Sequence, residues 1–201
     1  MIYLASKSPR RSELLRQLGV AFDELHLREA PGRNRDIVEE AEDDEPPAHY
    51  VERIARTKAA VAWARMQQRK LALHPVLGAD TEVVIGTEVL GKPRDASHAA
   101  DMLARLSGRT HDVMTGVALK TSDDDIAFTM STSRVSFRDL SSDEIARYAA
   151  LPEALGKAGG YAIQGRAAAF VAHLDGSYSG VMGLPLFETA ELLARTGLVV
   201  L

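Results

Sequence analysis

The hydrophobic pattern of this chain shifts repeatedly between the period of a strand and the period of a helix. Short apolar or alternating runs predict strands, and apolar residues three or four positions apart predict amphipathic helices. The expected strands cover residues 2–5, 20–25, 75–80 with a continuation to 85, 111–120, 125–137 and 168–174. The expected helices cover residues 9–18, 48–69, 96–106, 143–150 and 185–195. Because the two kinds of element mix throughout, the sequence predicts an α/β fold.

Local signals support the first two helices. Ser8 is suited to an N-cap, Pro9 to the first helical position and Gly19 to the C-terminal stop. The inner face of the helix over residues 48–69 is rich in alanine, so we expect close packing there. Lys58 lies on that same face.

Length and composition narrow the class of protein. The chain has 201 residues, which predicts a single domain over 1–201 that can contain two lobes. No run of about 18 apolar residues is present, so no membrane span is expected. The N-terminus is apolar first and basic afterwards, the reverse of a secretory signal. The absence of cysteine excludes disulfides, thiolate zinc sites and a cysteine nucleophile, and it fits a cytoplasmic location.

The charge is unevenly distributed. Seven acids lie in residues 36–45 (DIVEEAEDDE), and without them the 24 basic residues would exceed the other 21 acids by three. Residues 28–47 read as a long exposed loop, since they are polar and broken by proline and glycine. The acidic run is either a mobile lid or a solvated insert, and the insert is favoured because charge runs are usually solvated.

Several residues are candidates for chemistry. Residues 6–11 (SKSPRR) join a strand to a helix start, where backbone N–H groups favour an anion. Asp80 closes an apolar run, which suits a metal ligand or a general base, although a turn aspartate is the plainer alternative. Lys58 and Lys92 could neutralise phosphates, but Lys58 could equally extend its stem to water. His111 is interpreted as structural, and no histidine pair has zinc spacing.

Two glycine-rich loops complete the set. Residues 156–165 (GKAGGYAIQG) contain Gln164, whose amide can pair with a base edge, and residues 176–185 (GSYSGVMGLP) form the second loop. Glycine lets backbone approach a ligand closely, but ordinary turns use glycine as well.

Taken in order, these segments resemble the Maf family of nucleotide pyrophosphatases, also described as septum-formation inhibitors. The matching segments are LASKSPRR at 4–11, GADTEVV at 78–84, GKPRD at 91–95, LSGRTHDVMTGVAL at 106–119, GKAGGYAIQG at 156–165 and GSYSGVMGLPLFET at 176–189. They span nearly the whole chain. The AGGYAIQG segment resembles the branch that hydrolyses dTTP and UTP rather than the branch that acts on 7-methyl-GTP.

The resemblance implies a fold and a reaction. The fold would be that of inosine-triphosphate pyrophosphatases, an elongated, mixed and twisted sheet with helices in two lobes around a cleft. The reaction would convert a nucleoside triphosphate and water into the monophosphate and pyrophosphate, with Mg²⁺ or Mn²⁺ as cofactor. Family members are often cytoplasmic homodimers.

The resemblance also assigns roles by position. Asp80 matches the catalytic acid that activates water and would bind the metal. Positions linked to base specificity are Arg10, Thr81 and Gln164, and positions that line the triphosphate are Ser8, Arg11, Lys58 and Lys92. The family has a second acid in the early loop, and Glu29 is placed there, although LREAPGRNRD departs from the family pattern.

The sequence also bears on two other functions. A nucleotide-sensing regulator of septum formation, without significant turnover, is the alternative to the enzyme, but a pure sensor does not require a base. Nucleic-acid binding is not expected, because the chain lacks a basic face and has only five Phe, five Tyr and one Trp without clustering.

Overall fold

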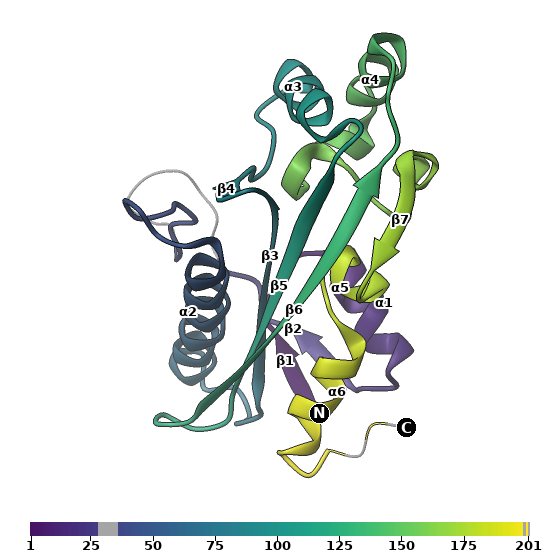
Figure 1. The fold of residues 1–201 in the computed structure, drawn as a ribbon. Coiled ribbons are helices and arrows are strands. Elements are labelled where there is room, and N and C mark those ends of the chain that lie inside the picture. The colour runs from purple at the N-terminus through teal and green to yellow at the C-terminus, as the bar shows by residue number, and fades with distance from the viewer. Residues whose placement is uncertain (28–35, 199, 201) are drawn as a thin grey trace. The chain divides into compact units, whose positions relative to one another are not determined.

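A computed structural model describes residues 1–27, 36–198 and 200 of the chain. Strands and helices alternate along it, as Figure 1 shows. In chain order the elements are β1 (Ile2–Leu4), α1 (Pro9–Gln17), β2 (Phe22–Glu24), α2 (Pro47–Gln68), β3 (Val76–Ile85), β4 (Glu88–Val89), α3 (Ala96–Leu106), β5 (Thr110–Lys120), β6 (Ile126–Phe137), α4 (Ser142–Ala149), the 3-10 turns η1 (Pro152–Ala154), η2 (Ala158–Gly160) and η3 (Arg166–Phe170), β7 (Val171–Asp175), α5 (Tyr178–Met182) and α6 (Leu186–Ala194). The predicted α/β class is confirmed.

Within the described residues the strands form one seven-stranded mixed sheet. Its order is β2-β1-β3-β5-β6-β7, and β4 pairs with β3. β1 is parallel to β2 and to β3, whereas β4 and β7 are antiparallel to their neighbours. Parallel neighbours need a crossover connection. Helix α1 provides it between β1 and β2, and α2 lies between β2 and β3 in the chain.

The chain divides into two compact units. The first comprises Met1–Asp80, Thr115–Ser131 and Gly183–Leu201, and the second comprises Thr81–Met114 and Thr132–Met182. Strands β3, β5 and β6 contribute residues to both units. No helix in the described part of the chain is both long and apolar enough to cross a bilayer.

In the first unit, α2 lies on one face of the sheet, and α1 and α6 lie on the other (Figure 1). Trp63 and Met66 of α2 pack against Tyr3 and Val76 on the sheet. Leu14 of α1 is 3% exposed, as expected for the apolar face of an amphipathic helix. Apolar burial on both faces of the sheet stabilises the parallel strands.

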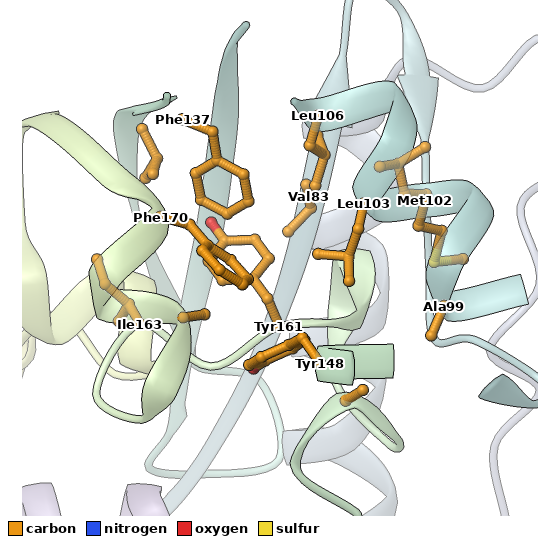
Figure 2. Close-up of a cluster of buried hydrophobic side chains, with 14 of the residues drawn as sticks. Val83, Ala99, Met102, Leu103, Leu106, Phe137, Tyr148, Tyr161, Ile163 and Phe170 are labelled. Atoms are coloured by element: carbon orange, nitrogen blue, oxygen red, sulfur yellow. The ribbon is translucent and has the colours of Figure 1, made fainter. Parts of the chain in front are cut away.

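The core of the second unit is built from α3 and a group of aromatic rings, as Figure 2 shows. Helix α3 is amphipathic and points Met102, Leu103 and Leu106 inward. The rings of Phe137 and Tyr161 meet edge to face, with 4.9 Å between their centroids. Such edge contacts add to the stabilisation from burial alone.

The helix caps follow the sequence in part. The capping box of α4 pairs the Ser141 side chain with the Glu144 N–H, and the Glu144 carboxylate accepts the Ser141 N–H. Ser8 occupies the N-cap position of α1, but its side chain makes no capping hydrogen bond. The position predicted for Ser8 is therefore right.

Two predicted segments differ from the structure. The strand expected over 168–174 begins only at Val171, because residues 166–170 form η3. An apolar run as short as RAAAF does not distinguish a strand from a tight turn. The loop expected over 176–185 contains α5, whose start is fixed by the Gly180 N–H donating to Ser177 Oγ (2.9 Å). Five residues are too few to show helical periodicity.

Candidate active site

Asp80 is a buried carboxylate in the interior of a strand. It is 5% exposed, and the neighbouring Ala79 and Leu77 of β3 are fully buried. Strand β3 continues through Asp80 to Ile85. The interpretation of Asp80 as an ordinary turn aspartate is therefore wrong. A charge at such a position is costly unless a partner compensates it.

Lys58 of α2 provides that partner. Its Nζ lies 2.7 Å from Asp80 Oδ1 and 2.7 Å from Glu39 Oε1. The Lys58 side chain is 11% exposed and the Asp80 side chain 7%, so this pair is shielded from water. The ammonium joins two carboxylates and does not extend to solvent. Among the described residues, no donor reaches Asp80 Oδ2.

Close packing between α2 and β3 places the two charges opposite each other. A Cβ atom on Gly78 would lie 2.6 Å from Ala55 O and 2.6 Å from Ala59 N. Only glycine fits there, and the alanines leave the helix backbone accessible to the strand. Lys58 lies between Ala55 and Ala59, and Asp80 follows Gly78 by two residues. The close packing expected from the alanine-rich face is confirmed.

The acidic segment, residues 36–45, lies along α2. Asp36 pairs with Arg65, Glu39 with Lys58 and Glu45 with Arg53. Hydrogen bonds from Arg53 hold the pKa of Glu45 below its ordinary value. The expectation of a solvated insert is therefore wrong for Asp36 and Glu45, whose side chains are buried in these pairs, whereas the Glu39 side chain stays exposed. Favourable pairing with a basic helix face outweighs full solvation, and that face is formed by residues up to 29 positions away.

The segment after β1 starts beside β3. The Ala5 N–H donates to Leu77 O (2.8 Å), and the chain then leaves the sheet on the side toward which β3 carries Asp80. Arg11 Nε donates to Gly183 O (2.8 Å). Arg11 thus ties the start of α1 to the turn before α6. Burial lowers the pKa of Arg10 from its ordinary value.

The remaining predicted residues belong to the second unit. Thr81 follows Asp80 on β3 and is half-buried, whereas Lys92 and Gln164 are exposed. The Gly159 N–H donates to Gly91 O (2.8 Å), which joins the turn before Lys92 to the glycine-rich loop of Gln164. Ser8, Arg10, Arg11, Lys58 and Asp80 belong to the first unit.

The second acid placed by sequence, Glu29, lies outside the described residues. Among the described acids of the early loop, Glu39 contacts Lys58. The acidic run itself was the available signal, but its composition did not show which of seven acids would face Lys58. Among the described residues, no three His, Asp or Glu side chains form a cluster that could enclose a metal ion.

Comparison with known proteins confirms the family resemblance that the sequence segments indicated. The family model described as Maf-like protein matches residues 1–196. A dTTP/UTP pyrophosphatase of Nitrosomonas europaea is 52% identical over 99% of this chain and 96% of its own length. A dTTP/UTP pyrophosphatase of Nitrosospira multiformis is 52% identical over 98% of this chain and 95% of its own length.

A solved structure extends the likeness to the fold. A HAM1 protein from Coxiella burnetii superposes with a TM-score of 0.52 at 16% identity, over 96% of this chain and 98% of that one. At this identity the likeness concerns the fold alone, which supports the predicted fold of the inosine-triphosphate pyrophosphatase type. With the family model covering nearly every residue, this chain belongs to the Maf family.

Proposed function

We propose that this protein is a nucleoside triphosphate pyrophosphatase that hydrolyses dTTP and UTP. One water would cleave the bond between the α-phosphorus and the bridging oxygen, which gives the monophosphate and pyrophosphate. The relatives named dTTP/UTP pyrophosphatase, 52% identical over nearly the full chain, support this substrate class. The observation that carries the proposal is the buried Asp80 carboxylate, which Lys58 contacts through Oδ1.

Asp80 is the proposed general base. Lys58 orients the carboxylate by its bond to Oδ1, and the carboxylate would accept a proton from the attacking water. A base held in one orientation within hydrogen-bond reach of water contributes about 10²–10⁴-fold to a rate. The fixed geometry supports this role for Asp80.

Basic groups would balance the charge of the triphosphate. Lys58 is a point charge that is already desolvated. Arg11 has a guanidinium suited to phosphate oxygens, and Ser8 offers a hydroxyl at the N-cap of the same helix. Lys92 is exposed, and the family resemblance assigns it to the triphosphate.

A divalent cation fits the donors of the first unit. Asp80 Oδ2 is a buried oxygen with no donor among the described residues, and Glu39 adds a second carboxylate next to Lys58. Mg²⁺ is typically held by one or two carboxylates and completes its shell with substrate phosphates and water. When bound, Mg²⁺ or Mn²⁺ would withdraw charge from the phosphate oxygens and favour attack.

Gln164 is proposed to select the nucleobase. Its amide is exposed at the end of a buried stretch of backbone. A thymine or uracil ring presents an N–H donor beside carbonyl acceptors, and a carboxamide offers the complementary acceptor and donor. Arg10 and Thr81 are proposed to assist this selection.

The test is a product assay with dTTP. Pyrophosphate and dTMP are measured with Mg²⁺, with Mn²⁺ and with a chelator, for the native protein and for Asp80→Asn. We expect Asp80→Asn to lower kcat at least about 100-fold, because the base is lost. Asp101→Asn, an exposed change of the same type on α3, is the matched control and should keep the native rate. An Asp80→Asn protein that retains most of its rate would contradict the role of Asp80, and full activity with chelator would contradict the metal.

A further inference from the structure

The loop that carries Gln164 is buried over residues 161–163 and exposed at Gln164. Tyr161, Ala162 and Ile163 are each 5% exposed, and Gln164 follows them at the surface. An exposed amide can discriminate between bases only if its backbone keeps one position. The contacts that fix this backbone therefore bear on selectivity.

Two side chains outside the loop hold its backbone on both sides of Gln164. The Ala162 N–H donates to the Tyr148 hydroxyl (3.1 Å), and that hydroxyl donates to Glu153 Oε1 (2.7 Å). The same carboxylate oxygen accepts the Arg166 N–H (2.9 Å). One chain of hydrogen bonds thus ties the backbone two residues before Gln164 to the backbone two residues after it.

The two anchors are themselves held in place. The Tyr148 ring packs edge to face on Phe170, with 5.1 Å between centroids, and Figure 2 shows both within the aromatic cluster. Burial and the hydrogen bond to Glu153 raise the pKa of the Tyr148 hydroxyl, so it remains a donor. A Cβ atom on Gly165 would clash with Glu153 Oε2, so the carboxylate lies directly against the loop.

We propose that Tyr148 and Glu153 are positioning residues that set base selectivity by fixing the backbone around Gln164. They act through the loop and touch no substrate atom. The inference rests on the proposed function, because it assigns the selectivity of that activity to residues on α4 and η1. The His111–Tyr161 contact (2.8 Å) holds the start of the same loop from the core side.

The experiment compares four variants that differ in which hydrogen bonds they remove. Tyr148→Phe keeps the ring and removes the hydroxyl, and Glu153→Ala removes the shared acceptor. Glu153→Gln keeps a carbonyl oxygen that can accept both bonds, so it serves as the conservative rescue. Ser141→Ala removes the N-cap of α4 without a contact to the loop, and it controls for loss of stability in the helix that carries Tyr148.

The first readout is the ratio of kcat/KM for dTTP to kcat/KM for dGTP. We expect Tyr148→Phe and Glu153→Ala to lower this ratio about tenfold, the effect of one lost hydrogen bond, mainly through a higher KM for dTTP. Glu153→Gln and Ser141→Ala should keep the native ratio. The second readout is hydrogen exchange, which should accelerate at the Ala162 amide in Tyr148→Phe and at the Arg166 amide in Glu153→Ala, and should stay native in the other two variants.

The possible outcomes distinguish a failure of the inference from a failure of the proposed function. A native ratio in Glu153→Ala, in a protein active on dTTP, would overturn the inference and leave the proposed function intact. An equal loss of selectivity in Ser141→Ala would also overturn it, because general destabilisation would then explain the effect. Amides that exchange at native rates in both anchor variants would do the same. A native protein inactive on every nucleotide would overturn the proposed function, and this inference with it.

Discussion

Lys58 determines how two acids can coexist in the first unit. Its ammonium is the shared partner of Asp80 and Glu39, at 2.7 Å from each. Without it, two carboxylates would face each other, one of them buried. The lysine therefore both stabilises the fold and orients the proposed base.

Replacement of Lys58 by methionine should destabilise the protein. Removing one partner of a buried pair costs about 3 kcal/mol or more, because the other charge is left uncompensated. Asp80→Asn removes that charge, so the double variant Lys58→Met/Asp80→Asn should be more stable than Lys58→Met alone. Unfolding in urea measures both free energies. Equal stabilities of the single and double variants would show that the pair is not coupled.

His111 is the residue whose titration should be visible in stability. It is 2% exposed, and burial lowers its pKa to about 4. The unfolded chain binds the proton near pH 6.5, well before the folded protein does. Stability from the neutral imidazole is therefore complete above about pH 6.5 and is lost as the pH falls toward 4.

His111→Gln should remove that pH dependence. Between about pH 7 and pH 4.5, the native protein should lose on the order of 2–3 kcal/mol of unfolding free energy more than the variant. Other acid effects are common to both proteins, such as the lowered pKa of Glu144 beside Arg138, and they cancel in the difference. Urea unfolding at the two pH values checks this. Parallel losses in both proteins would exclude His111 as the source.

At the scale of elements, the contact between α2 and β3 positions the proposed chemistry. Gly78 lets the strand lie against the helix backbone at Ala55 and Ala59. The contact between Lys58 and Asp80 follows from that register. The acidic segment adds a second constraint, since it pairs with α2 near its start, middle and end. Disturbing the helix–strand contact should therefore affect both stability and turnover.

Gly78→Ala tests that contact. The added methyl meets backbone atoms at 2.6 Å, which cannot move aside as a flexible side chain could. We expect a loss of about 2–3 kcal/mol from overpacking, and a loss of turnover because Lys58 shifts against Asp80. Gly19→Ala is the control: its Cβ meets nothing within 4 Å, so only its positive φ should cost about 1 kcal/mol. Native activity in Gly78→Ala would show that this packing contact does not position Lys58 and Asp80 for turnover.

The sequence was most informative where an element is long and periodic. Helix α2, α3 and strands β5 and β6 were predicted to within two residues at each end, because their apolar periodicity is sustained. The five-residue α5 and the turn η3 were missed, because neither spans enough residues to show a period. Ion pairs such as Asp36–Arg65 were also missed, since charge composition does not specify partners.

At the scale of the whole molecule, residues far apart in the chain meet within the first unit. Arg11 contacts Gly183, 172 positions away, and Lys58 contacts Asp80, 22 positions away. Periodicity alone predicts no such pairing. The family segments supply candidate residue types at these positions, whereas the structure shows which of them touch. The predicted site residues are divided between the two units. The proposed general base, Asp80, belongs to the first unit, and Gln164, which is proposed to recognise the nucleobase, belongs to the second.

The most direct test of the account is pyrophosphate release from a panel of triphosphates with Mg²⁺, comprising dTTP, UTP, dCTP, dATP and dGTP. The account predicts release from dTTP and UTP at a kcat/KM at least about tenfold above the others, the effect of one well-placed hydrogen bond to the base. A folded protein that binds these nucleotides but releases no pyrophosphate from any of them would contradict it, and so would a preference for purines.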